Sequence, residues 1–123
     1  MTALETSLSY LRLWTSGASD DAWALLDRDV VCVSPAGVLN GRDAVVAFMA
    51  PFAAGLVSSE LLGSFGDDGR ALILYDTATA AVASAPAAEL HSVVDGRITG
   101  IRIVFDRLPF ALARGDVVPK PQA

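Results

Sequence analysis

The hydrophobic positions in the first half of the chain recur at helical spacing. Apolar side chains within residues 3–16 repeat every three or four positions, which predicts an amphipathic helix that ends before Gly17. A serine and two aspartates follow as an N-cap and an acidic first turn, so we expect a short second helix over residues 20–26. A third helix is expected over residues 42–54, although Pro51 must bend or end it.

The remaining patterns predict strands. Residues 30–34 are rich in β-branched side chains, and a turn containing proline and glycine leads to a brief second strand at residues 38–39. Residues 60–65 and 70–79 form a second pair of strands, which the polar turn at residues 66–69 connects. The order of helices followed by longer strands indicates an α+β fold.

The most informative stretch is residues 89–106, where two runs rich in β-branched residues flank Asp95-Gly96. Asp-Gly is typical of a two-residue hairpin turn that needs φ > 0 at both positions. Counting outward from this turn gives these cross-strand pairs: Val94 with Arg97, Val93 with Ile98, His91 with Gly100, Glu89 with Arg102, Leu90 with Ile101, and Ala88 with Ile103.

This register gives the predicted hairpin two different faces. Leu90 would lie on the inner, apolar face, and the outer face would carry Glu89, His91 and Arg102 together with the apolar side chains of Val93, Ile98 and Val104. A shift of one residue would instead turn Glu89, His91 and Arg102 into the interior, because side chains alternate between the faces of a strand.

Composition narrows the possible classes of function. The 123 residues suffice for one domain, which we place at residues 1–110, with a mobile tail over residues 111–123. The net charge of −5 without a basic cluster argues against nucleic acid as a partner. One cysteine and one histidine argue against a disulfide and a multi-residue metal site. We find neither a membrane span nor a secretion leader and therefore expect a cytoplasmic location.

The order of elements and three segments of the chain resemble the nuclear transport factor 2-like superfamily, in particular its SnoaL-like members. The segments are Leu25-Leu26-Asp27 with residues 30–35, Leu39-Asn40-Gly41-Arg42-Asp43, and Val94-Asp95-Gly96-Arg97-Ile98 with Phe105-Asp106. The resemblance implies a cone of three helices packed on a curved, mixed, mostly antiparallel sheet that encloses an apolar cavity. It also implies a homodimer through the outer face of the sheet.

The same resemblance indicates which known chemistries this chain lacks. Ketosteroid isomerases have a tyrosine in the first helix, and Tyr10 stands at that position. Their general base precedes the proline of the first hairpin, where this chain has Ser34. Epoxide hydrolases and SnoaL-like cyclases have an acid after an arginine on the last strand, where this chain has Ile103. We therefore expect neither isomerase nor epoxide hydrolase activity of the known types.

Four residues remain candidates for catalysis: Tyr10, Glu89, His91 and Asp76. Each also has a purely structural interpretation, namely a packed Tyr10, an outward-facing His91, a Glu89–Arg102 ion pair and an exposed Asp76 at a strand end. The candidate pocket residues are Tyr10, Trp14, Ser34, Phe48, Phe52, Leu90, Ile101, Ile103 and Phe105. Cys32 is most simply a buried small side chain.

Two classes of function follow from these candidates. The first is a protein that binds a small hydrophobic, polyketide-like or steroid-like molecule in an apolar cavity. The second is an isomerase, cyclase or hydrolase that needs no cofactor and no metal and uses Tyr10 with Glu89, His91 or Asp76. The two are distinguished by the face of the sheet on which these acidic and basic side chains lie.

Overall fold

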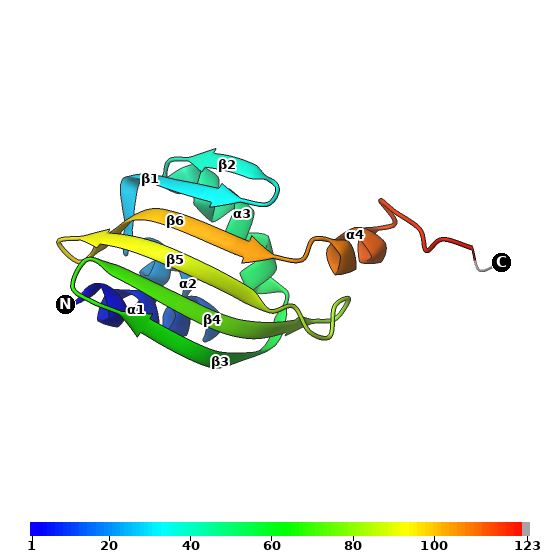
Figure 1. Cartoon of the computed structure of the whole chain (residues 1–123), viewed down its shortest axis with the longest axis horizontal. Helices are drawn as coiled ribbons and strands as arrows, with labels where there is room; N and C mark the ends of the chain where they lie inside the picture. The colour runs from blue at the N-terminus through cyan, green and yellow to red at the C-terminus, as the bar shows by residue number, and fades with distance from the viewer. Residues whose placement is uncertain (122–123) are drawn as a thin grey trace.

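Six strands form a single curved sheet in the order β2-β1-β6-β5-β4-β3, in a computed structural model of the chain that describes residues 1–121 (Figure 1). All neighbouring strands are antiparallel except β1 and β6, which are parallel. The strands are β1 (Leu26–Ser34), β2 (Gly37–Asn40), β3 (Leu56–Gly66), β4 (Arg70–Thr79), β5 (Ala87–Val94) and β6 (Arg97–Phe105).

Three helices cover one face of this sheet, as Figure 1 shows, and they are α1 (Ala3–Thr15), α2 (Ser19–Trp23) and α3 (Arg42–Ala54). The α+β class, the mixed sheet and these three helices are confirmed. A fourth helix, α4 (Leu108–Arg114), follows β6 and projects beyond the end of the sheet (Figure 1). This helix spans residue 110, where we expected the domain to end and the tail to begin. Residues 122 and 123 of that tail lie outside the described residues.

Local sequence signals explain where the first helix begins and ends. The side chain of Thr2 accepts a hydrogen bond from the backbone N–H of Glu5 at 3.1 Å, so the N-terminus of α1 is capped. At the other end Gly17 has φ of 91°, a left-handed conformation that glycine adopts without strain. Tyr10 and Trp14 lie on the buried face of this helix.

The β5–β6 hairpin confirms part of the predicted register and corrects the rest. Asp95 and Gly96 have φ of 50° and 72°, and Val93 pairs with Ile98 as expected. Beyond this point a β-bulge inserts one extra residue into β6, so that Ser92, not His91, pairs with Gly100. The predicted partners of four residues were therefore wrong, and the observed pairs are His91–Ile101, Leu90–Arg102, Glu89–Ile103 and Ala88–Val104.

Because of this bulge in β6, the side chains of β5 lie on the faces of the sheet opposite to those predicted. The bulge lets Ile98, Ile101 and Ile103 all point inward, whereas a regular strand would place Ile98 opposite to the other two. Glu89 and His91 consequently lie in the interior, where they are 1% and 0% exposed. Their predicted position on the outer face was wrong, as was that of Val93 and Ile98, which are buried.

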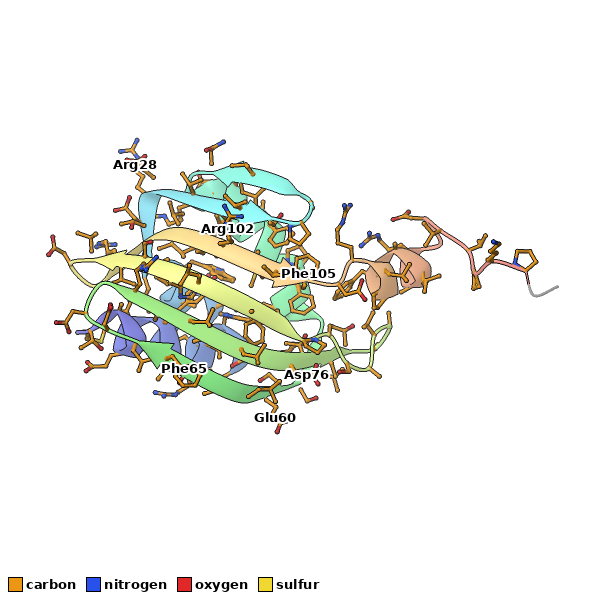
Figure 2. All side chains as sticks on the ribbon, in the orientation of Figure 1. Arg28, Glu60, Phe65, Asp76, Arg102 and Phe105 are labelled. Carbon is orange, nitrogen blue, oxygen red and sulfur yellow. The ribbon has the colours of Figure 1, made fainter. Side chains whose placement is uncertain are left out.

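Leu90 and Arg102 occupy the opposite, outer face of the sheet. Leu90 pairs with Arg102, which is exposed, and Figure 2 labels Arg102 on β6. The predicted Glu89–Arg102 ion pair is therefore not formed, because the two side chains lie on opposite faces. The outer face nevertheless exposes large apolar side chains, which include those of Val31, Leu72, Leu74 and Val104. Within residues 1–121, no helix is long and apolar enough to cross a membrane.

Candidate functional site

An apolar cavity of about 320 Å³ lies between α3, the ends of the central strands and α4. Its wall is formed mainly by aromatic and aliphatic side chains, among them Phe48, Phe52, Ile103, Phe105 and Phe110. Tyr75 and Thr77 of β4 and Ala87 of β5 also line it. Figure 2 labels Phe105 at the end of β6 that leads to α4. Cavities of this size and polarity are typical of sites for small molecules.

The aromatic side chain of Phe110 attaches α4 to this wall. Its ring lies edge-on to Phe105, with a centroid distance of 5.9 Å, and edge-on to Phe52 at 6.1 Å. Phe48 also packs against Phe105, with a centroid distance of 6.5 Å and an angle of 36° between the ring planes. Edge-to-face contacts at these distances are favourable for aromatic pairs. The helix at the end of the chain therefore completes the cavity that the sheet and α3 begin.

A chain of buried polar side chains runs from α1 to the wall of the cavity. The Ser7 Oγ lies 2.7 Å from His91 Nδ1, and His91 Nε2 lies 2.9 Å from Glu89 Oε1. The other carboxylate oxygen of Glu89 accepts a hydrogen bond from the Tyr75 hydroxyl. All four side chains are buried.

The directions of these hydrogen bonds follow from the acceptor character of a carboxylate. Ionised Glu89 can only accept, so Tyr75 and the Nε2–H of His91 both donate to it. When the imidazole is neutral and carries its proton on Nε2, its Nδ1 accepts a hydrogen bond from the Ser7 hydroxyl. The network satisfies the polar atoms of His91 and Glu89 without water, as buried polar groups require.

Burial and the charge of Glu89 keep the neighbouring acidic groups protonated. Burial raises the pKa of Tyr75 well above its usual value, and the adjacent Glu89 carboxylate raises this pKa further. The same two causes raise the pKa of Tyr10. They also raise the pKa of Cys32 to about 11. The Tyr75 hydroxyl is therefore a hydrogen-bond donor, and not a phenolate, at neutral pH.

Two buried polar atoms beside this network have no hydrogen-bond partner within residues 1–121, namely the Tyr10 hydroxyl and the Trp14 Nε1. The Tyr10 ring lies edge-on to His91 at 5.6 Å, and Trp14 lies edge-on to Tyr75 at 5.7 Å. The residues that line the cavity include neither of these two side chains. Both belong to the core behind Tyr75.

The structure brings together some of the predicted pocket residues and separates others. Phe48, Phe52, Ile103 and Phe105 line the cavity. Tyr10, Trp14 and Ile101 are buried in the core. Ser34 belongs to the β1–β2 turn, where its hydroxyl donates to the Gly37 carbonyl at 2.9 Å. Leu90 faces away from the cavity because the bulge changes the register of β5.

The predicted catalytic residues are likewise divided. Glu89 and His91 form one hydrogen-bonded pair, and Tyr10 packs against His91. Asp76 is separate from them, since its carboxylate accepts hydrogen bonds from the Ser84 hydroxyl and from the backbone N–H of Ala85. These bonds hold the loop that follows β4.

Sequence reasoning missed Ser7 and Tyr75. Ser7 lies on the same helical face as Tyr10 and Trp14, and a hydroxyl on a buried helical face needs a partner. Tyr75 alternates with Ile73 and Thr77 along β4, which places all three on the inner face of the sheet. Both signals are present in the sequence, but the pairing predicted for a regular hairpin places their partners, His91 and Glu89, on the outer face.

The network limits the chemistry available to the cavity. Ser7, His91 and Glu89 are connected in the order of a nucleophilic triad, but Ser7 is fully buried and is not part of the cavity wall. Tyr75 is the member that lines the cavity. Within residues 1–121, no group of three or more His, Cys, Asp or Glu side chains is arranged to hold a metal ion.

Comparison with known proteins identifies a family model that matches this chain and solved structures with the same fold. Residues 8–101 match the model of the SnoaL-like domain. A protein from Kribbella flavida DSM 17836 has a sequence 50% identical to this chain. Its crystal structure matches with a TM-score of 0.90, over 94% of this chain and 95% of that chain. No curated protein matches the chain.

Two less similar structures share the fold. An NTF2-like protein of unknown function from Cytophaga hutchinsonii ATCC 33406 has a TM-score of 0.73 at 17% identity, over 89% of this chain and 95% of that chain. A protein from Sinorhizobium meliloti, provisionally named as a polyketide cyclase, has a TM-score of 0.69 at 17% identity, over 80% of this chain and 93% of that chain.

Proposed function

Because the chain belongs to the SnoaL-like domain family, we propose that it binds a small hydrophobic, cyclic molecule in the cavity beneath α4. The observation that carries this proposal is the cavity itself, about 320 Å³ in volume and walled by aromatic side chains from α3, β6 and α4. The Sinorhizobium meliloti protein, provisionally named as a polyketide cyclase, shares the fold, which favours a polyketide-like ligand. A steroid-like ligand rests on the resemblance to the ketosteroid isomerases alone.

Binding without turnover agrees best with the lining of the cavity. No Asp or Glu of residues 1–121 is part of the wall, so a ligand meets no carboxylate that could abstract a proton directly. Ser34 forms hydrogen bonds within its own turn, and Ile103 is an aliphatic part of the wall. Burial of apolar ligand surface would supply the affinity, at roughly 25 cal/mol per Å².

The test is titration with N-phenyl-1-naphthylamine, a neutral dye whose fluorescence rises in apolar surroundings. Ala87 and Ala88 are neighbours on β5 that point to opposite faces, since Ala87 lines the cavity and Ala88 pairs with Leu74 and Val104 of the outer face. We expect Ala87→Phe to fill the cavity and abolish dye binding, and Ala88→Phe to preserve it. Equal binding by both folded variants would refute the proposal.

A second function is favoured by the hydrogen bond between Tyr75 and Glu89. Tyr75 lines the cavity and donates to a buried carboxylate, so its oxygen could accept a proton from a ligand while its own proton passes to Glu89. This relay would support an isomerase or cyclase without a cofactor, in which Tyr75 takes the part we had expected of Tyr10. Turnover of any bound ligand that survives Tyr75→Phe with unchanged kcat would exclude the relay.

We also propose that two copies of the chain associate through the outer face of the sheet. Leu72, Leu74 and Val104 are each at least 41% exposed there, which favours coverage by another apolar surface. We further propose that the protein is located in the cytoplasm. Fractionation of cells that express the tagged chain tests this location.

A further inference from the structure

The charged residues in the cavity wall are both arginines. Arg107 and Arg114 line the cavity, whereas its other lining residues are uncharged and no acidic residue of the described part of the chain is among them. The whole chain carries a net charge of −5 with only nine Lys plus Arg. The lining of the cavity is therefore cationic, although the chain as a whole is acidic.

The helical geometry of α4 places these cations together with Phe110. Arg107 precedes Phe110 by three positions, and Arg114 follows it by four, so all three fall on one side of the helix. Phe110 contacts Phe52 and Phe105 in the wall. The side of α4 that faces the cavity therefore carries the ring of Phe110, with the guanidinium groups of Arg107 and Arg114 toward its N-terminal and C-terminal ends.

Neither arginine uses all of its hydrogen-bond donors within residues 1–121. Arg107 donates to the Pro35 carbonyl at 3.5 Å, the upper limit for a hydrogen bond, and it is exposed. Arg114 uses its Nε to pair with Asp116 at 2.8 Å, and this pair is on the surface, with both side chains about 60% exposed. The Nη groups of Arg114 take no part in that bond. Both side chains can therefore donate further hydrogen bonds to an acceptor at the mouth of the cavity.

We propose that the natural ligand is amphipathic, with an apolar body in the cavity and one anionic group, a carboxylate or an oxoanion of similar size, held by Arg107 and Arg114. This inference rests on the proposed function, because it specifies the ligand of the same cavity. A guanidinium group matches a carboxylate with two parallel N–H donors, which is the geometry that Arg provides and an aromatic wall does not.

The experiment compares two dyes that differ by one sulfonate group. N-phenyl-1-naphthylamine is neutral, and 8-anilinonaphthalene-1-sulfonate has the same ring system with a negative charge. We expect the unmodified protein to bind the sulfonate with a lower Kd, and the Arg107→Gln/Arg114→Gln double variant to raise that Kd roughly tenfold while leaving the Kd of the neutral dye unchanged. The preference for the sulfonate should also weaken at high salt.

Arg102→Gln is the matched control, because Arg102 is an exposed arginine on the outer face of the sheet. It should leave both Kd values unchanged. A sulfonate Kd that rises in Arg102→Gln and not in the double variant would overturn the inference, since the anion would then bind outside the cavity. A double variant that keeps the preference for the sulfonate would overturn it as well.

A carboxylate probe tests whether the preference for an anionic group also holds for a ligand that is not a dye. Decanoate should displace the neutral dye from the unmodified protein at a lower concentration than decan-1-ol does, and the two should be equal in the double variant. If the neutral dye binds and decanoate has no advantage, the inference about the anion fails and the cavity remains a binding site. If neither dye binds, the proposed function itself fails.

Discussion

The Tyr75 hydroxyl, on a side chain that lines the cavity, donates a hydrogen bond to the buried carboxylate of Glu89 on the neighbouring strand. Glu89 in turn holds His91, which contacts Ser7 of α1. One acid thus connects the cavity wall, the centre of the sheet and the first helix. The stability of this buried network therefore depends on each member keeping its hydrogen-bond partner within the protein.

The two tyrosines of the chain should respond differently to loss of the hydroxyl. Tyr75→Phe removes the donor to Glu89 and should lower the free energy of unfolding by ~1.5–3 kcal/mol, because a buried charge loses a hydrogen bond. Tyr10→Phe removes a buried hydroxyl without a partner in residues 1–121 and should be neutral or stabilising by up to ~1 kcal/mol. Urea denaturation of both variants measures the difference. Equal losses would contradict the described network.

Glu89 itself should tolerate an amide far better than a truncation. In Glu89→Gln the amide oxygen can accept from Tyr75, and its NH2 group can donate to Nε2 of the other tautomer of His91, so we expect a loss of ~1 kcal/mol. Glu89→Ala leaves two buried donors, the Tyr75 hydroxyl and the His91 Nε2–H, without an acceptor, and at ~1–3 kcal/mol for each it should cost ~2–6 kcal/mol. The measurement is again urea denaturation, with the far-UV circular dichroism of each variant as a control for folding. A Gln variant as unstable as the Ala variant would contradict these hydrogen-bond roles.

The sequence predicted the fold well because its strongest signals are local. The helices of residues 3–16 and 42–54 follow from hydrophobic spacing, and Asp95-Gly96 determines the hairpin turn. The pairing beyond Val93 could not be predicted by counting outward from the turn, because such a count assumes one residue opposite each partner. Thr99 is the extra residue of the bulge and breaks this rule. Gly100, an isolated glycine inside a strand, was the available indication of a bulge.

The site was less predictable because it depends on contacts between distant elements. A single inserted residue decides whether Glu89 and His91 face water or the core, and that choice assembles the network with Ser7, which is 84 positions from His91. The apolar wall was partly predicted, since Phe48, Phe52, Ile103 and Phe105 line the cavity. Phe110 and the two arginines were not, because helix α4 lacks a hydrophobic period long enough to recognise.

Alkaline pH should destabilise the protein. The pKa of Cys32 rises from its ordinary 9.0 to about 11 in the folded protein, and the pKa values of Tyr10 and Tyr75 rise above their ordinary 10.0. The unfolded chain therefore releases these protons at lower pH, so the stability present below pH 9 is lost as pH rises through 9 to 11. Thermal unfolding between pH 8 and 11 measures this loss.

Cys32→Ala provides the control for this pH dependence. This variant lacks the thiol, whose ordinary pKa of 9.0 is the lowest of the three groups. The Tm of the variant should therefore begin to decrease at a higher pH than the Tm of the unmodified protein. Below pH 9 the absolute stability of the variant should be lower, because a buried side chain is shortened. A Tm that stays constant up to pH 11 would show that these groups are exposed in the folded state.

A charge on the outer face should prevent the proposed association. Leu74 is 41% exposed on β4, next to Ala88 of β5 on the same face. Leu74→Lys should convert a dimer to a monomer in sedimentation velocity at micromolar concentration, because burial of an unpaired ammonium is costly. Val118→Lys is the control, since Val118 is 80% exposed in the segment after α4. A monomeric unmodified protein would remove the dimer.

The central claim is that a small apolar molecule binds in the cavity beneath α4 and not on the exposed apolar outer face. Intermolecular nuclear Overhauser effects from N-phenyl-1-naphthylamine to methyl-labelled protein test it most directly. We predict contacts with the methyl groups of Met49 and Ile103, which line the cavity. Contacts confined to Leu74 and Val104, which lie on the outer face, would contradict the account.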